Sequence, residues 1–167
     1  MKKYCNKCKR YAKKEIEGDK MKIIIPLGGK GTRLRPHTHT KPKPLLHVAG
    51  KSILGHILDD LNNSSLNISE IIFITGLFKE KIEEFVTKNY KFKARFIEQK
   101  IMDGSARAIK LAERFVSEDI LIIYADTIFE TDLNIIKKAQ KNKTVDGMIW
   151  VKEVEDYQRF GVVIHDE

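Results

Sequence analysis

The stretch that decides the fold is MKIIIPLGGKGTRLRPHTHTKPKPLLHVAGKSI, residues 21–53. It opens with the apolar run IIIPL at residues 23–27, which predicts a buried strand. Gly28, Gly29 and Gly31 follow directly. Glycines after a strand let the backbone approach a ligand closely and turn its N–H groups toward phosphate oxygens. The stretch therefore predicts a phosphate-binding loop at the end of a strand.

Basic side chains stand in and just after this loop. Lys30, Arg33 and Arg35 add positive charge, and the Pro-Lys-Pro segment at 42–44 holds Lys43 between two rigid residues. A guanidinium offers a fork of donors to phosphate oxygens, and a lysine on stiff backbone offers a charge in a fixed place. These residues predict a cradle for a triphosphate.

Two better-known phosphate loops are absent from the stretch. A dinucleotide fingerprint that uses Gly29 and Gly31 needs glycine or alanine three residues later, where Leu34 stands. A P-loop that ends in the Gly-Lys-Ser at 50–52 needs glycine at the position of Leu45. The predicted phosphate loop is therefore of another kind.

Residues 29–38 (GKGTRLRPHT) and 42–45 (PKPL) resemble the signature of the sugar-1-phosphate nucleotidyltransferases, in particular the glucose-1-phosphate thymidylyl- and uridylyltransferases. That signature reads G-x-G-T-R-L-x-P-x-T-x-x-x-P-K-P-L after a strand, and both halves are in register here. The resemblance covers about residues 21–166. It implies the family's Rossmann-like, three-layer α/β/α fold with a mostly parallel sheet, truncated at the C-terminus, so that only the N-terminal, nucleotide-binding part is present.

Helical and extended patterns alternate along the rest of the chain. Helices are predicted at 52–62, 79–90, 104–115 and 131–141, with Ser52 and Thr131 as N-caps, and strands at 71–74, 93–98, 120–124, 146–151 and 160–164. Several of these strands are apolar throughout, which is typical of a parallel sheet covered by helices on both faces.

The resemblance also implies a reaction. An oxygen of a sugar 1-phosphate attacks the α-phosphate of a nucleoside triphosphate, pyrophosphate leaves, and an NDP-sugar forms; dTTP or UTP and glucose 1-phosphate are the expected substrates. Arg33 is expected to hold the β- and γ-phosphates, and Lys43 to contact the α-phosphate or the sugar phosphate, as the two catalytic residues. The expected nucleotide-binding residues of the loop are Leu27, Gly28, Gly29, Gly31 and Thr32.

Asp126 is the expected metal ligand. It follows the apolar run at 120–124, so its carboxylate is expected at the carboxyl end of a strand, where ligands bind in such sheets. Magnesium prefers oxygen ligands, and phosphoryl chemistry needs charge neutralisation, so Mg²⁺ is the expected cofactor. The family usually has Gly-Asp here, whereas this chain has Ala125 before the aspartate. The alternative is that Asp126 only caps a turn.

Gln99 and Gly104 are the expected base-reading residues. In the family a glutamine after this strand is followed five residues later by a glycine that opens a helix, and this chain keeps that spacing. The family's proline is absent from the loop, with Met102 near its place, which leaves the base preference open. Further on, Gly161 matches the glycine of the family's Y-G-V segment and is the expected substrate-binding residue, with Phe160 where tyrosine is usual.

Residues 1–20 do not resemble the family and are expected to form a flexible basic extension before a nucleotidyltransferase domain at 21–167 that is incomplete at its C-terminus. The extension holds eight Lys/Arg and three Asp/Glu and so carries most of the net charge of +8, which makes that charge weak evidence for nucleic-acid binding. Cys5 and Cys8 resemble half of a zinc site without the other half. With no apolar run of membrane-spanning length and no signal peptide, a cytoplasmic location without a membrane partner is expected.

Three functions remain open on the sequence. The first is the sugar-1-phosphate nucleotidyltransferase, active alone, as a homo-oligomer or with a complementing C-terminal chain. The second is a non-catalytic nucleotide-binding or regulatory subunit. The third is a cytidylyltransferase that acts on an acceptor similar to phosphocholine. Turnover separates the first from the second, and the choice of acceptor separates the third.

Overall fold

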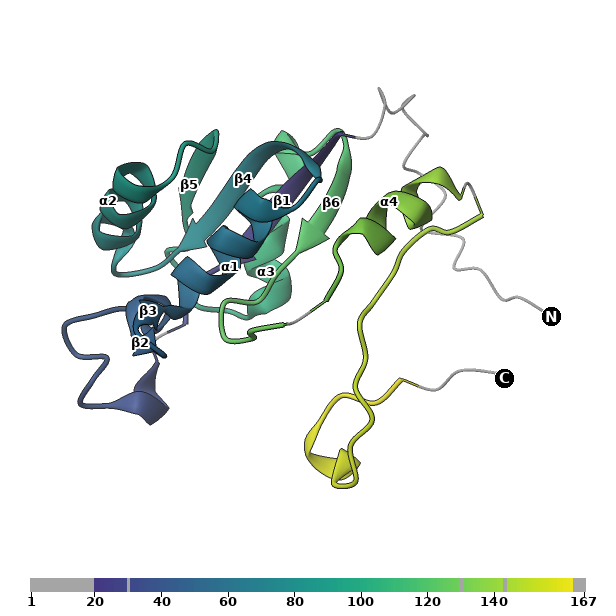
Figure 1. Cartoon of the computed structure of the whole chain (residues 1–167). Coiled ribbons are helices and arrows are strands. Elements are labelled where there is room, and N and C mark those ends of the chain that lie inside the picture. Colours follow the sequence, from purple (N-terminus) through teal and green to yellow (C-terminus); the bar gives the residue numbers. More distant parts are fainter. Residues whose placement is uncertain (1–19, 30, 130, 143, 164–167) are drawn as a thin grey trace.

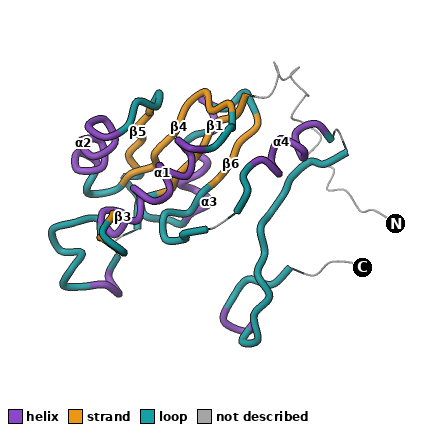
Figure 2. Tube along the Cα trace, in the orientation of Figure 1, coloured by secondary structure: helices purple, strands orange, loops and turns teal. Residues whose placement is uncertain are grey.

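A four-stranded parallel sheet forms the centre of the molecule (Figures 1 and 2). The computed structural model describes residues 20–163 except 30, 130 and 143. The strands are β1 (Lys20–Pro26), β4 (Asn67–Thr75), β5 (Ala94–Glu98) and β6 (Asp119–Ile122), and they lie in the order β5-β4-β1-β6. All three pairings are parallel. The predicted extension at 1–20 lies outside the described residues except for Lys20, as do Cys5 and Cys8.

Helices cover both faces of this sheet. They are α1 (Ile53–Asn63), α2 (Lys79–Asn89), α3 (Ser105–Lys110) and α4 (Asn134–Lys141). Residues of α1, α2 and α4 belong to one hydrophobic cluster, whereas Ala108 of α3 belongs to another on the opposite face. Figure 1 shows α1 in front of the sheet and α3 behind it. The predicted three-layer α/β/α arrangement is confirmed.

The central segments of β1 and β4, at 23–25 and 71–74, are apolar at every position because both of their faces are buried. Ile23 of β1 and Phe73 of β4 point into the cluster with α1, while Ile24 and Ile72 point into the cluster with α3. Side chains alternate between the two faces of a strand, so a strand covered on both sides needs an unbroken apolar run. The strands predicted from the runs at 23–27, 71–74 and 120–124 are confirmed, with ends shifted by a few residues.

Short elements connect the signature to α1. A 3-10 turn spans Thr32–Leu34, another spans Lys43–Leu45, and the two-residue strands β2 (His47–Val48) and β3 (Lys51–Ser52) pair as a small hairpin. The predicted cap of α1 is confirmed, since the Ser52 hydroxyl accepts a hydrogen bond from the Gly55 amide at 3.0 Å.

One predicted helix after residue 104 is confirmed only in part, and three other features predicted there were wrong. The helix predicted at 104–115 is α-helical only to Lys110 and ends in a 3-10 turn at Glu113–Phe115, because its last turns close through i→i+3 backbone bonds. Thr131 does not cap α4; the Asp132 carboxylate accepts from the Asn134 amide instead. No strand forms over 146–151, nor over 160–163 in the described part of the 160–164 prediction, since no neighbouring strand supplies a ladder of hydrogen bonds there.

On the face of the sheet that α3 covers, a buried carboxylate links β4 to β5 and β1 through ion pairs. Glu70 of β4 is 2% exposed; Arg95 of β5 donates to it at 2.9 Å, and the Lys22 ammonium of β1 lies 3.4 Å away. Burial raises the pKa of Glu70, but these two cations outweigh burial and hold that pKa below its usual value. The ionised carboxylate therefore stabilises the folded state.

Replacing Glu70 by glutamine is expected to lower the free energy of unfolding by about 2–3 kcal/mol at neutral pH, because a buried hydrogen bond to a charged group is lost. A pKa that is lower in the folded state gives stability above the unfolded value that is lost as the pH falls through the folded value. The gap between wild type and variant in urea unfolding should therefore shrink below about pH 4. A gap that stays constant with pH would contradict this account, and Glu98→Gln, at an exposed residue of β5, is the control.

The strand order places a ligand crevice between β1 and β6. In chain order the sheet grows from β1 to β4 and β5 on one side, and then returns to add β6 on the other side of β1. In open parallel sheets ligands bind at such a reversal, at the carboxyl ends of the strands. The segments after β1 and β6, at 27–29 and 123–127, both lie at this end because the two strands are parallel. None of the described helices has the length and apolar character needed to cross a bilayer.

Candidate functional site

At Gly28 and Gly31 the glycine loop leaves little room for a side chain. Gly31 has a φ of 59°, and a Cβ there would stand 2.9 Å from the Cγ2 of buried Thr38. The Thr38 hydroxyl donates to the carbonyl of Gly31 at 2.8 Å and holds this turn in place. A Cβ on Gly28 would stand 2.9 Å from the Oε1 of Gln99. The loop therefore presents bare backbone at the carboxyl end of β1.

Replacing Gly31 by alanine is expected to lower the free energy of unfolding by about 1–2 kcal/mol, because an L-residue in the left-handed region is strained and the new methyl group meets Thr38. Gly29→Ala is the matched control, since a Cβ on Gly29 has no neighbour within 4 Å. Thermal unfolding of both variants checks this. Equal melting temperatures for the two would show that the turn carries no such strain.

Lys43 and Asp126 meet across the crevice. The lysine ammonium donates to the Oδ2 of Asp126 at 3.1 Å, although 83 residues separate the two in the chain. Pro42 and Pro44 are both buried and anchor the backbone on either side of the lysine, while Asp126 follows β6. The sequence singled out both residues, and the fold brings them together.

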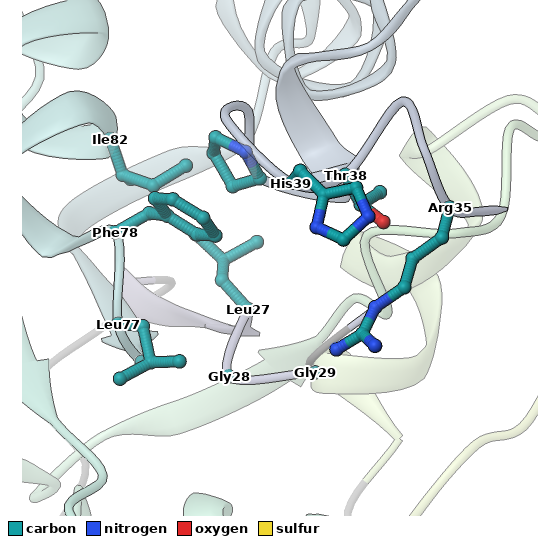
Figure 3. A pocket seen from close by; sticks show the side chains of 11 residues that line it. Leu27, Gly28, Gly29, Arg35, Thr38, His39, Leu77, Phe78 and Ile82 are labelled. Carbon is teal, nitrogen blue, oxygen red and sulfur yellow. The ribbon is translucent and has the colours of Figure 1, made fainter. Parts of the chain in front are cut away.

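Two cavities flank the glycine loop and share Leu27 and Gly29. The larger, of about 350 Å³, is also lined by Gly31, Thr32, Lys43 and Asp126 among others. The smaller, of about 150 Å³, has an apolar wall with Leu77, Phe78 and Ile82, and a basic wall with Arg35 and His39. Figure 3 shows the Arg35 guanidinium directed toward Gly29 and the Phe78 ring facing Leu27. An apolar wall beside a basic one suits a base joined to phosphates.

Gln99 follows β5 and lies beside Gly28 of the glycine loop, although it lines a third cavity, together with Asp103 and Arg107, and not the two that flank the loop. Its side chain is 6% exposed, and its Nε2 donates to the Asp103 carboxylate at 3.2 Å and to the Gly104 carbonyl at 3.3 Å. Arg107 of α3 donates to the second oxygen of Asp103 at 2.9 Å. This guanidinium, together with the Gln99 amide, lowers the pKa of Asp103, so the carboxyl stays ionised at neutral pH. The two predicted base-reading residues, Gln99 and Gly104, are thus in direct contact with each other, and their role toward a base stays a prediction.

Two predicted site residues, Arg33 and Gly161, take part in none of the contacts described above. Arg33 belongs to the 3-10 turn after the loop, and its side chain lies outside what the structure describes. Gly161 lies in the irregular segment after the turn at Tyr157–Arg159 and lines neither cavity beside the glycine loop. In Figure 1 this segment runs away from the sheet. The roles of Arg33 and Gly161 therefore stay predictions.

Sequence reasoning missed two residues of the site. His39 lines the smaller cavity opposite the apolar wall, and Asp103 bonds the Gln99 amide, yet neither received a role. The signal for His39 was its place eight residues after Gly31 in a basic segment. For Asp103 the signal was its position between Gln99 and Gly104, which lie together in the fold.

The carboxylates of the crevice determine whether it can hold Mg²⁺. The described residues contain no cluster of three or more His, Cys, Asp or Glu side chains that could enclose a metal ion. Magnesium is usually held by one or two carboxylates together with substrate phosphates and water. Asp126, with its side chain 56% exposed at the cavity that Gly29 and Gly31 line, meets that requirement. The site therefore fits a metal that arrives with a nucleotide.

Known proteins match this chain in sequence and in fold. The bifunctional protein GlmU of Methanocaldococcus jannaschii is 37% identical over 147 residues, which are 88% of this chain and 33% of GlmU. The UTP–glucose-1-phosphate uridylyltransferase AglF of Haloferax volcanii is 31% identical over 150 residues, 88% of this chain and 61% of AglF. A Bacillus anthracis structure described as a glucose-1-phosphate thymidylyltransferase superposes with a TM-score of 0.65 and 28% identity, over 74% of this chain and 51% of that one.

The chain spans about a third of the length of the GlmU relative and about half of the solved structure. The family match nevertheless covers nearly all of the described residues, including the glycine loop, Lys43, Gln99 and Asp126. The parallel sheet with its crevice at β1 agrees with this match. This chain, over residues 22–167, belongs to the nucleotidyl transferase family.

Proposed function

We propose that this chain binds a nucleoside triphosphate with Mg²⁺ in the crevice and transfers its nucleotidyl group to a sugar 1-phosphate, giving an NDP-sugar and pyrophosphate. The nucleotide is UTP or dTTP, and the acceptor is glucose 1-phosphate. The observation that carries the proposal is the 3.1 Å contact between Lys43 and Asp126 at the cavity lined by Gly29 and Gly31. The names of AglF and of the Bacillus anthracis protein support the choice of base and sugar.

Different residues of the crevice bind the phosphates, stabilise the developing charge and hold the metal ion in this reaction. The amides of the glycine loop hold phosphate oxygens, and Lys43 stabilises the negative charge that grows on the transferred phosphate. The sugar phosphate is already ionised at neutral pH, so its oxygen attacks without a general base. A Mg²⁺ ion held by Asp126 would supply further charge neutralisation when bound. The protein contributes alignment and charge rather than proton transfer.

The test is transfer of label from [α-³²P]UTP or [α-³²P]dTTP to glucose 1-phosphate, with Mg²⁺ and with pyrophosphatase to pull the reaction forward. Labelled UDP- or dTDP-glucose is the expected product. Parallel reactions with CTP and phosphocholine test the cytidylyltransferase alternative. Nucleotide binding without any labelled product from either acceptor would contradict the proposal and leave the non-catalytic nucleotide-binding subunit.

A further inference from the structure

We propose that Asp103 is a positioning residue that fixes the side-chain amide of Gln99 so that its carbonyl oxygen faces the nucleotide, which selects bases that carry an imino N–H, uracil and thymine, over cytosine. This inference rests on the proposed function and adds a physical basis for the choice of base. It is carried by two hydrogen bonds of one buried side chain, those of Gln99 with Asp103 and Gly104, and by the position of its Oε1 beside Gly28.

The orientation of the amide follows from its neighbours. An ionised carboxylate and a backbone carbonyl can only accept hydrogen bonds, so the atom that contacts both Asp103 and Gly104 must be the Nε2 of Gln99. Its Oε1 then points the other way. A flipped amide would set an oxygen against two acceptors, in a side chain that is only 6% exposed.

The Oε1 of Gln99 lies beside the glycine loop, to which the proposed function assigns the nucleotide. It lies 2.9 Å from the position of a Cβ on Gly28, in the loop that presents its backbone to the crevice. The Met102 sulfur is 3.4 Å from that same position, and Met102 is 37% exposed. Methionine is flexible, so a base can move this side chain aside and meet the Gln99 oxygen.

Uracil and cytosine differ only at ring positions 3 and 4, on the edge that the Gln99 oxygen would contact. Uracil and thymine carry a hydrogen on ring nitrogen 3 and can donate it to the Gln99 oxygen. The same nitrogen of cytosine is a bare acceptor that opposes another acceptor. A site built to bond one of these groups rejects the analogue that lacks it, because buried polar atoms stay unpaired.

Arg107 supports the arrangement from the other side. Its Nε donates to the Oδ2 of Asp103 at 2.9 Å, while the Oδ1 takes the bond from Gln99. The carboxylate thus bridges a surface cation of α3 and the buried amide. Arg107 does not bond Gln99 in the structure, so a change at this residue alters the amide only through Asp103.

The experiment measures the Kd of Mg·UTP and Mg·CTP by calorimetry on the full chain and its variants. Wild type is expected to bind UTP at least about tenfold more tightly than CTP, and Asp103→Asn is expected to reduce this ratio about tenfold, since an amide can donate as well as accept and no longer orients Gln99. Arg107→Gln is expected to reduce the ratio by less. Glu98→Gln removes an exposed carboxylate next to Gln99 and is expected to change both affinities together and leave the ratio unchanged.

Each outcome decides the inference. An unchanged ratio in Asp103→Asn, or equal affinities of wild type for UTP and CTP, overturns it while nucleotide binding and the proposed function stand. Absence of binding by any nucleotide to wild type overturns both. Melting curves of the free variants show whether each is folded, and Arg107→Gln, changed at a side chain 69% exposed, keeps the test open if Asp103→Asn does not fold.

Discussion

Replacing Asp126 by asparagine is expected to lower the rate of nucleotidyl transfer by about 10²–10³-fold, the range found when one stabilising group of a charged transition state is removed. The melting temperature of the free protein should hardly change. The Asp126 side chain is 56% exposed and pairs with Lys43, and exposed ion pairs contribute little stability. A neutral amide is a much poorer ligand for Mg²⁺ than a carboxylate.

The matched control for this prediction is Asp60→Asn. Asp60 is exposed on α1 and lines a different cavity, together with residues such as Asn63 and Asn134. Rates are measured at several Mg²⁺ concentrations for wild type and both variants. An Asp126→Asn protein with the wild-type rate and the wild-type Mg²⁺ dependence would remove Asp126 from the metal site.

Replacing Lys43 by methionine is expected to change two properties in opposite directions. Nucleotidyl transfer should fall by about 100-fold, because the charge that stabilises the transferred phosphate is lost. The affinity of the nucleotide-free protein for Mn²⁺, a spectroscopic probe for Mg²⁺, should rise, because Asp126 loses the ammonium 3.1 Å away. A purely structural role for Lys43 would give no such rise.

Titration of Mn²⁺ followed by electron paramagnetic resonance measures this affinity, and the transfer assay measures the rate. Lys41→Met, at an exposed lysine of the same segment, is the control for a general loss of positive charge. A Mn²⁺ affinity that is unchanged or lower in Lys43→Met would contradict the arrangement in which this lysine holds the carboxylate before the nucleotide arrives.

Much of the fold was predictable from local pattern. The runs at 23–27 and 71–74 are apolar at every position but Pro26, and a run of that length is typical of a strand buried on both faces. Ser52 predicted the start of α1 because its hydroxyl can accept a hydrogen bond from a backbone amide of the first turn. The two prolines beside Lys43 likewise predicted a lysine on rigid backbone, and both prolines are buried in the structure.

The wrong or missed predictions concern residues whose structure depends on contacts with distant parts of the chain, which a local sequence pattern does not specify. The segment at 146–151 carries strand-forming residues, but a strand also needs a neighbour for its backbone, and none lies beside it among the described residues. In the sequence, Asp103 cannot be told from any other acidic loop residue. Its hydrogen bonds with Gln99 and Arg107 form only in the folded protein. The orientation of an amide is a property of the atoms around it.

The most direct test of the account is a calorimetric titration of the full chain with UTP, once with Mg²⁺ and once with EDTA. The account predicts one site that binds Mg·UTP, with a Kd at least about tenfold larger in EDTA and in Asp126→Asn, since a metal ion held by Asp126 would neutralise charge on the triphosphate. No binding in either solution, or the same Kd with and without Mg²⁺ in wild type, would contradict it.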